Sequence, residues 1–321
     1  EDDILFNTRN SYELVGKTTI WDDSIQNCVY NNNIMRIRIN NSILPKFLFY
    51  FMNSSRFRNT LLFVKKSTTN ICAIYDKDLK EQLVILPPLN EQKRIISKIE
   101  ELFSKIDSTK QSLEQIKLQL EQYRASLLKS VFEGKLTEDW KVIKINELTK
   151  SRKIGLVRAI REQSTSGTPY LKMNNITIDG QLDLSSIVYV NCSDQELGNY
   201  LLEKNDILFN TRNSFELVGK TTIWDNSINN CIFNNNIMRI RTNNKILPKL
   251  LCYFMNSNMF KTKLLSVKKA TTNICAIYDK DLKEQLVSFP MDIKQQKEII
   301  ARIEQGFSLI ENTTQIVNST L

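Results

Sequence analysis

Two short polar stretches of the chain contain residue types that suit contact with a polyanion. The first is NTRNS, which supplies Arg9 and Asn10 and occurs again with Arg212 and Asn213. Arginine makes bidentate hydrogen bonds to guanine, and asparagine makes them to adenine. The alternative is a polar turn after a strand, in which Asn and Ser serve backbone geometry. We therefore keep these four residues as candidates for base contact.

The second stretch reads VKKSTTN in one place and VKKATTN in another, so that two adjacent lysines precede small hydroxyl side chains. Such lysines anchor phosphates, whereas a solvated loop is the simpler interpretation. Further basic and amide residues between positions 152 and 175 are candidates without a repeated counterpart. The candidates from these regions are Lys65, Lys66, Thr68, Thr69, Asn70, Lys268, Lys269, Thr271, Thr272 and Asn273, together with Arg152, Lys153, Lys172, Asn174 and Asn175.

Residues for catalysis are scarce. The chain has no histidine, which removes the commonest general base and the usual histidine-containing metal sites. The Walker-type phosphate loop, the GxSxG elbow and the Asn/Asp-Pro-Pro-aromatic element of adenine methyltransferases are all missing from the sequence. Asp76, Asp78 and Glu81 lie close together, but this spacing equally suits the start of a helix. We predict no catalytic residue, no metal site and no cofactor-binding residue in this chain.

The net charge of +9 favours a polyanionic partner. The cysteines form no CxxC pair and are predicted to be small buried side chains in a reducing cytoplasm. No apolar run approaches the roughly 20 residues that span a bilayer, so we expect a soluble protein without a membrane partner. The six cysteines are Cys28, Cys72, Cys192, Cys231, Cys252 and Cys275.

The strongest feature of the sequence is an internal repeat. The segment DILFNTRNSYELVGKTTIWDDSIQNCVYNNNIMRIR, from Asp3 to Arg38, recurs almost unchanged from Asp206 to Arg241. The match continues through TTNICAIYDKDLKEQLV, which begins at Thr68 and again at Thr271. Roughly three quarters of the positions are identical over about 85 residues, with a spacing of about 203 residues. This spacing predicts two similar domains with a connector, because solenoid repeats are much shorter.

A helix is predicted after each copy of the repeat. After Pro87 and Pro88 no glycine or proline occurs until Gly134, and apolar residues recur about every 3.5 positions. About 44 residues would make a rod of about 65 Å that packs against another helix. The second helix starts the same pattern at Lys294 but meets Gly306, so we expect it to be interrupted and short. The predicted seam consists of Ile96, Ile99, Phe103, Ile106, Leu113, Ile116, Leu120, Tyr123 and Leu127.

Residues 140–204 have no counterpart earlier in the chain. The apolar alternations TPYLKMNNITI and IVYVN, separated by glycines, indicate strands and turns. The complete domain is therefore expected at about Trp140–Pro290, and residues 1–87 match only its second half. The asparagine runs at 31–33 and 234–236 are interpreted as turns before the strand IMRIR.

Five segments taken in order point to a known family. They are TPYLKMNNIT from Thr168, LLEKNDILFNTRNS from Leu201, NNNIMRI from Asn31 and Asn234, LPPLNEQKRIISKIEELFSKID from Leu86, and the connector SVFEGKLTEDWK from Ser130. With them the chain resembles the DNA specificity subunit of type I restriction-modification systems along nearly its whole length. The resemblance implies a mixed α/β (α+β) fold with two similar target-recognition domains, separated by long antiparallel coiled-coil spacer helices.

The resemblance also implies domain boundaries. We expect the C-terminal half of the first target-recognition domain at residues 1–87, with its N-terminal half absent, and the first spacer helix at 88–136. The second target-recognition domain is expected at 137–290, and a short or truncated second spacer helix at 291–321.

The function implied by the resemblance is recognition of a bipartite target in double-stranded DNA. Two methylation subunits and a restriction subunit would dock on the chain, and S-adenosylmethionine would bind to the methylation subunit. Because the two domains are nearly identical, we expect an interrupted palindromic target. Two alternatives stay open: a half-length specificity protein that works as a homodimer, and a coiled-coil scaffold that does not bind DNA.

Overall fold

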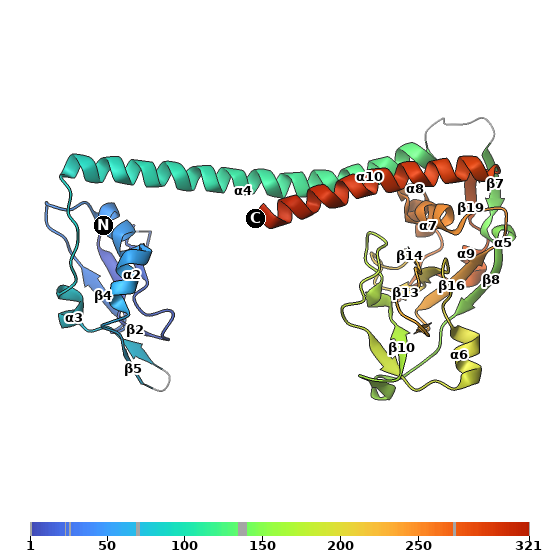
Figure 1. Cartoon of the computed structure of the whole chain (residues 1–321), viewed down its shortest axis with the longest axis horizontal. Coiled ribbons are helices and arrows are strands. Elements are labelled where there is room, and N and C mark those ends of the chain that lie inside the picture. Colours follow the sequence, from blue (N-terminus) through green and yellow to red (C-terminus); the bar gives the residue numbers. More distant parts are fainter. Residues whose placement is uncertain are drawn as a thin grey trace. The chain divides into compact units, whose positions relative to one another are not determined.

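The computed structural model describes residues 2–22, 24–25, 27–68, 71–133, 140–271 and 274–320. These residues form two units, divided between Ser112 and Leu113, and each unit is described by itself (Figure 1). Helices and strands are mixed in both units, which confirms the predicted fold class.

The first unit contains two small antiparallel sheets with the strand orders β3-β1-β4 and β2-β6-β5. Its elements are β1 (Ile4–Asn7), β2 (Arg9–Asn10), β3 (Thr18–Ile20), β4 (Ile34–Ile37), α1 (Pro45–Asn53), α2 (Ser55–Leu61), β5 (Lys66–Ser67), β6 (Cys72–Ala73), α3 (Asp76–Lys80) and the start of α4 (Leu89–Phe132). The alternation along β1 buries Ile4 and Phe6 in a core with Met52 and Phe57 of the two helices. Helix α2 begins after Ser54, whose Oγ accepts a hydrogen bond from the Phe57 amide at 3.3 Å.

The second unit repeats this arrangement and adds strands to it. Its sheets have the orders β14-β12-β16-β8, β13-β18-β17, β15-β10-β11-β9 and β19-β7. Its strands are β7 (Trp140–Lys144), β8 (Thr149–Ile154), β9 (Gln163–Ser164), β10 (Thr168–Leu171), β11 (Val188–Val190), β12 (Ile207–Asn210), β13 (Arg212–Asn213), β14 (Thr221–Ile223), β15 (Ile232–Phe233), β16 (Ile237–Thr242), β17 (Lys269–Ala270), β18 (Cys275–Ala276) and β19 (Leu286–Pro290). Its helices are α5 (Ile145–Leu148), η1 (Ile160–Glu162), η2 (Met173–Asn175), α6 (Asp194–Tyr200), α7 (Pro248–Asn256), α8 (Asn258–Leu265), α9 (Asp279–Leu282) and α10 (Ile293–Thr320).

The strands predicted from TPYLKMNNITI and IVYVN are present as β10 and β11, which pair antiparallel. The asparagine runs form turns, as predicted. In the second unit the Asn236 amide donates to Asn234 Oδ1 at 3.2 Å, and the Ile237 amide donates to the Asn234 carbonyl at 3.0 Å. This turn therefore leads directly into β16, and the corresponding turn in the first unit leads into β4.

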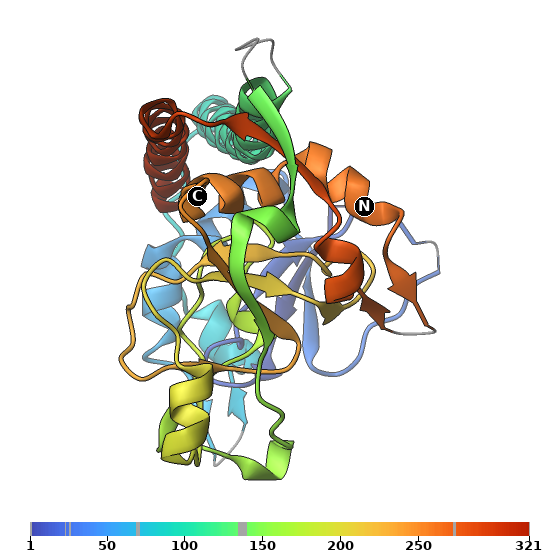
Figure 2. The ribbon, with the colours of Figure 1, turned by 90° about the vertical axis from the view of Figure 1, so that its right-hand side faces the viewer.

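Helix α10 packs antiparallel against the C-terminal part of α4 (Figures 1 and 2). The helices approach closely at Gly306, where a Cβ atom would lie 2.4 Å from Leu127 Cδ2. The guanidinium of Arg124 lies over the Phe307 ring, 4.0 Å from its centroid. Our expectation that Gly306 interrupts the helix is therefore wrong: α10 continues through it. A glycine at this position allows close helix packing, which outweighs its low helix propensity.

A buried glutamine attaches each long helix to its domain. Gln92 and Gln296 are 0% exposed. Gln296 Oε1 accepts from the Leu247 amide at 2.8 Å, and its Nε2 donates to the carbonyls of Lys245 and Pro290, each at 2.9 Å. Gln92 makes the corresponding bonds in the first unit. The side chain thus satisfies backbone groups of two chain segments where the helix begins.

The prediction of buried cysteines is only partly correct. Burial raises the pKa of the Cys231 and Cys252 thiols to about 12, and Cys72 and Cys275 are also buried. Cys192 is half-buried and Cys28 is exposed, although Cys28 is the counterpart of buried Cys231. The difference arises because β15 follows Cys231 and is covered by β10 in the second unit, whereas Val29 and Tyr30 are exposed in the first.

Among the described helices, none is both long enough and apolar enough to cross a membrane.

Candidate nucleic-acid interface

The two polar stretches selected from the sequence meet in one three-stranded sheet. Arg9 of β2 pairs with Ala73 of β6, which pairs on its other side with Lys66 of β5. The same sheet forms in the second unit, where Ala276 of β18 lies between Arg212 and Lys269. We call these sheets the hairpin sheets: β2, β6 and β5 in the first unit, and β13, β18 and β17 in the second. Arginine and lysine thus occupy the two outer strands of each hairpin sheet, opposite the same alanine of the central strand.

The first lysine of each VKK stretch holds the turn after NTRNS. Lys65 Nζ donates to the Tyr12 carbonyl at 2.7 Å and lies 4.6 Å from the centroid of the Tyr12 ring. Lys268 Nζ donates in the same way to the Phe215 carbonyl and lies 4.5 Å from the Phe215 centroid. These contacts connect the two polar stretches of each unit and keep an aromatic ring at the edge of the hairpin sheet, where Tyr12 and Phe215 are exposed.

The second lysine of each VKK stretch is more exposed. Lys66 Nζ lies 3.7 Å from Asp78 Oδ2 and 5.3 Å from the Tyr75 ring centroid. Its counterpart Lys269 lies 3.8 Å from Asp281 Oδ2. The two lysine side chains are 56% and 53% exposed, whereas their carboxylate partners are only 20% and 23% exposed. The ammonium groups are therefore open to a phosphate on their solvent side.

The asparagines of NTRNS carry part of the turn geometry. Asn10 Oδ1 accepts from the Ser11 amide at 2.9 Å, and Asn213 Oδ1 accepts from the Ser214 amide at 2.9 Å. Asn213 Nδ2 also donates to Asn210 Oδ1 at 2.9 Å. These bonds fit the polar-turn interpretation, and they occupy much of the hydrogen-bonding capacity of Asn213.

The first threonine of each hairpin loop donates a hydrogen bond to a backbone carbonyl on the other side of the loop. Thr68 Oγ1 donates to the Ile71 carbonyl at 3.1 Å, and Thr271 Oγ1 donates to the Ile274 carbonyl at 3.0 Å. The remaining loop candidates, Thr69, Asn70, Thr272 and Asn273, lie outside the described residues.

Two of the unrepeated candidates have their polar groups bonded within the fold. The Arg152 guanidinium donates to Asp279 at 2.6 Å and to Asn146 at 3.0 Å, and its side chain is 13% exposed. Asn175 is 1% exposed and donates to the Asp183 carbonyl at 2.8 Å. Each of these two side chains therefore connects separate segments of the second unit.

The other unrepeated candidates lie nearer to solvent. Lys153 Nζ donates to Asn199 Oδ1 at 3.0 Å and lies over the Tyr200 ring, while Lys172 Nζ donates to Gln163 Oε1 at 3.2 Å. Asn174 is exposed in the short helix η2. These residues come from elements other than the hairpin sheet.

Sequence reasoning missed Lys220, which positions η2. Its Nζ donates to the carbonyls of Met173, at 3.0 Å, and Ile176. Burial lowers the pKa of this ammonium. The identical residue in the first repeat, Lys17, is exposed, so the sequence of the repeat alone contains no signal for this contact.

Sequence reasoning also missed an aromatic residue beside each hairpin sheet. Tyr75 and Tyr278 are each 43% exposed, near Lys66 and Lys269. A signal was present, since TNICAIYDKD occurs unchanged in both repeats. Exposed aromatic rings beside cationic side chains suit stacking and sugar contacts on nucleic acid. Among the described residues, no group of three or more Cys, Asp or Glu side chains is arranged to hold a metal ion.

The same basic hairpin sheet occurs in both units, and a long helix follows each copy, so the chain is built from a duplicated domain. The family model for the type I restriction modification DNA specificity domain matches residues 1–118 and 137–319. The chain therefore belongs to this family, which confirms the resemblance found in the sequence.

Curated relatives are specificity subunits of type I restriction enzymes. The chain is 28% identical over all its residues to the type I restriction enzyme EcoKI specificity subunit of Escherichia coli strain K12, of which it covers 71%. It is 26% identical over 94% of its residues to the EcoBI specificity subunit of Escherichia coli, of which it covers 67%.

Solved structures share the fold at lower sequence identity. The HsdS subunit from Thermoanaerobacter tengcongensis has a TM-score of 0.66 at 20% identity, over 98% of this chain and 75% of that one. A chain from a structure of the type I restriction-modification system has a TM-score of 0.67 at 20% identity, over 99% of this chain and 77% of that one.

Proposed function

We propose that this chain reads the DNA sequence for a type I restriction-modification complex and that each hairpin sheet supplies one reader. The observation that carries the proposal is the duplication of the hairpin sheet, with Arg9 and Lys66 in one copy and Arg212 and Lys269 in the other. Arginine on such an exposed strand suits a guanine edge in the major groove, and the lysine on the other outer strand of the sheet suits a phosphate.

The target that follows from this duplication is bipartite. The strand pairing, the two lysines, the arginine and the tyrosine after the hairpin (Tyr75 or Tyr278) are the same in both units. Both readers are therefore expected to select the same half-site. When two such readers meet opposite strands, the half-sites form an interrupted palindrome. The loop residues Thr69, Asn70, Thr272 and Asn273, together with Asn174, complete the set proposed to lie at or near the duplex.

The reaction itself is proposed to take place on partner subunits. Two methylation subunits, which would bind S-adenosylmethionine, and a restriction subunit would assemble on the chain. The exposed apolar side chains Leu102, Phe103 and Ile106 of α4 support docking along this helix, because they are 47%, 53% and 60% exposed. Exposed apolar side chains at helical spacing are typical of a partner surface.

The test is the methylated motif in DNA from cells that express the complete system. We expect one interrupted motif whose two halves are reverse complements. Two unrelated half-sites would contradict equivalent readers, and unmethylated DNA together with no DNA binding in a mobility-shift assay would favour a scaffold role.

A further inference from the structure

Each hairpin sheet carries an exposed isoleucine to which the proposed function assigns no role. Ile274 directly precedes β18, and its counterpart Ile71 directly precedes β6. Each of these side chains is 57% exposed. Because a single exposed isoleucine is common on protein surfaces, the side chains that share its face of the sheet decide what it can contact.

The strand register places this isoleucine on the same face as the arginine and the lysine. Arg212 and Lys269 both pair with Ala276 of β18. Directly paired residues of antiparallel strands point to one face, and so do residues two positions apart along a strand. Ile274 lies two positions before Ala276, and its carbonyl accepts a hydrogen bond from the Thr271 amide at 2.8 Å, which continues the ladder. Ile274 therefore shares its face of the sheet with Arg212 and Lys269.

Burial along the strand agrees with this register. Cys275, which lies between Ile274 and Ala276, is 1% exposed and belongs to the core of the second unit. Cys72 has the same burial in the core of the first unit. The opposite face of each hairpin sheet therefore packs on the core, and the exposed side chains lie on the face with the isoleucine.

The first unit has the same arrangement. Arg9 and Lys66 both pair with Ala73, and Ile71 lies two positions before this alanine. Strands β2 and β5 lie at the end of the first unit remote from the start of α4 (Figure 1). The exposed face of the hairpin sheet is thus built from the same residue types in both units.

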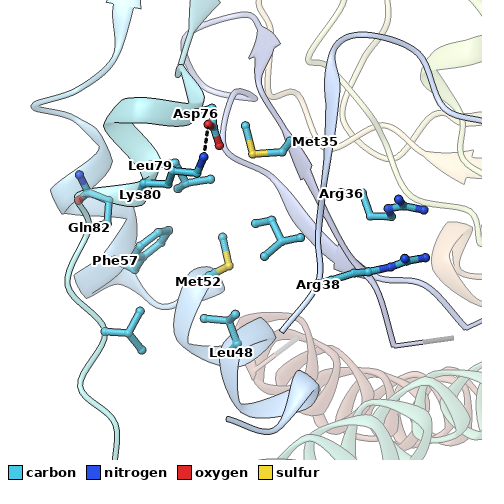
Figure 3. A pocket seen from close by; sticks show the side chains of 12 residues that line it. Met35, Arg36, Arg38, Leu48, Met52, Phe57, Asp76, Leu79, Lys80 and Gln82 are labelled. Atoms are coloured by element: carbon cyan, nitrogen blue, oxygen red, sulfur yellow. Dashed lines mark ion pairs between the residues drawn. The ribbon is translucent and has the colours of Figure 1, made fainter. Parts of the chain in front are cut away.

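Other apolar surfaces of the first unit are not equivalent to those of the second. The main sheet borders a cavity of about 430 Å³, whose wall includes Met35 and Leu48 (Figure 3). Met35 is partly buried, whereas its counterpart Met238 is 1% exposed. Ile71 and Ile274, in contrast, have the same exposed fraction. Their exposure therefore does not depend on the strands β7–β11 of the second unit.

The polar side chains next to the isoleucine are bonded within the fold. Thr271 Oγ1 donates to the Ile274 carbonyl at 3.0 Å, and Asn213 Nδ2 donates to a neighbouring asparagine side chain at 2.9 Å. Both are thus poorly placed to read a base edge. Among the described residues of this sheet, Arg212, Lys269 and Ile274 are the side chains on the exposed face that are open to a ligand.

An apolar side chain on a basic reading surface has a defined partner in the major groove. The apolar group on the base edges there is the C5 methyl of thymine, whereas the other groups are hydrogen-bond donors and acceptors. Ile274 lies roughly 7 Å along β18 from the residue that pairs with Arg212. Since successive base pairs are about 3.4 Å apart, a thymine at Ile274 would lie about two base pairs from a guanine at Arg212.

We propose that Ile274 and Ile71 are specificity-determining residues, each of which contacts the C5 methyl group of a thymine in its half-site. The thymine lies about two base pairs from the guanine that Arg212 or Arg9 contacts. Another base at this position would present a polar edge to the isoleucine and lose its hydrogen bonds to water. This inference rests on the proposed function, because it requires the hairpin sheets to lie at the duplex.

The test uses the chain assembled with its methylation subunits and a fluorescent duplex that contains the methylated motif. Each thymine of the motif is replaced in turn by uracil, which lacks the C5 methyl but keeps the same hydrogen-bonding groups. Fluorescence anisotropy at constant salt measures the affinity. We expect one position in each half-site at which uracil weakens binding roughly fourfold, and roughly 16-fold when both are replaced, because burial of one methyl group corresponds to that factor.

Variants of the chain connect this response to the isoleucines. Ile274→Ala should respond to uracil in both half-sites with only a roughly fourfold loss, and the double variant with Ile71→Ala should bind both duplexes equally. Ile178→Ala is the matched control and should keep the full response. Ile178 is 62% exposed and lies in a turn in which the Asp179 carbonyl accepts from Arg124 of α4 at 3.0 Å. All three isoleucines are exposed, so none of these changes should unfold the chain.

Three results would overturn the inference while leaving the proposed function intact. The first is equal binding of the thymine and uracil duplexes by the wild-type complex at every position, and the second is an unchanged response in Ile274→Ala. The third is loss of the methylation subunits from the Ile274→Ala complex, detected by mass measurement, since this would make the isoleucine a protein contact. Failure of the wild-type complex to bind the unmodified duplex would instead refute the proposed function and this inference with it.

Discussion

At the level of single residues, each hairpin sheet contains side chains that stabilise the fold and others that are available to contact a ligand. Lys65 and Lys268 are bonded to backbone carbonyls and so fix the turn. Arg212 and Lys269 are exposed on the two outer strands of the hairpin sheet, on either side of β18. Among the described residues neither side chain makes a hydrogen bond, although Lys269 Nζ lies 3.8 Å from Asp281 Oδ2. On the proposed function, we therefore expect Arg212 to contact a base and Lys269 to contact a phosphate.

Substitution of Arg212 by alanine should relax one base position in one half-site. The other half-site is read by the first unit, which keeps Arg9, so a palindromic target should become asymmetric. Loss of a good bidentate contact removes about 1–3 kcal/mol of discrimination. Motif sequencing of methylated DNA measures the change, and Arg9→Ala is the matched control that should relax the opposite half. A variant that still methylates only the original palindrome would refute base contact by Arg212.

Lys269→Gln should weaken binding to all sequences alike. Neutralising one phosphate contact should reduce the slope of log affinity against log salt by about 0.9. The measurement is a salt titration of DNA binding by the chain with its methylation subunits. Lys297→Gln makes the same change in charge on exposed α10 and should leave the slope unchanged. An equal effect of both substitutions would mean that only net charge matters.

The sequence identified both polar stretches, but it could not join them into one sheet. Arg9 and Lys66 meet through β6, and that non-local strand pairing has no local signature. The sequence also could not show that Arg152 forms an ion pair within the fold whereas other candidate cations are exposed. Its partner Asp279 lies 127 residues away, and only the folded chain brings the two together.

At the level of elements, a buried glutamine bonds the first turn of each long helix to backbone groups of its own unit. One Gln296 side chain bonds to three backbone groups, two in the segment before α7 and one at the end of β19. An apolar residue of similar size would leave the Leu247 amide without its partner. The cost of leaving such a group buried and unbonded is about 1–3 kcal/mol.

Gln296→Ala should therefore lower the free energy of unfolding of the second unit by about 1–3 kcal/mol. Urea denaturation, followed by hydrogen exchange of residues in α7, measures the change. Lys297→Ala, one position later on the exposed face, should change it by less than about 0.5 kcal/mol. If the two variants were equally stable, the three bonds of Gln296 would contribute nothing net.

Helix boundaries were easier to predict than helix packing. The first spacer helix was expected from residue 88, and α4 begins at Leu89, because two prolines precede an uninterrupted helical pattern. Gly306 was predicted to interrupt the second helix because glycine has a low helix propensity, which is a local property of the residue. Its role depends on Leu127, which only the pairing of α4 with α10 brings near.

At the scale of the whole molecule, two nearly identical sequences fold into units of unequal burial. Cys231 and Val287 are buried, while their counterparts Cys28 and Val84 are exposed. The sequence showed that residues 1–87 match only the second half of a domain. It could not show which surfaces the other half would cover, because coverage depends on the pairing of β8 with β16 and of β7 with β19.

Unequal burial predicts unequal stability within this one chain. Burial of a single valine or leucine side chain contributes about 1.5–3 kcal/mol. Val84 is 36% exposed, whereas its counterpart Val287 is 0% exposed. Amides of β4 should therefore open with a free energy at least about 2 kcal/mol lower than amides of β16, and exchange roughly 30-fold faster. Hydrogen exchange read by mass spectrometry compares the two strands in the same sample, so that pH and temperature are identical. Equal exchange would show that the surface around Val84 contributes no stability when it is covered, and the unequal environments of the two repeats would then have no energetic consequence.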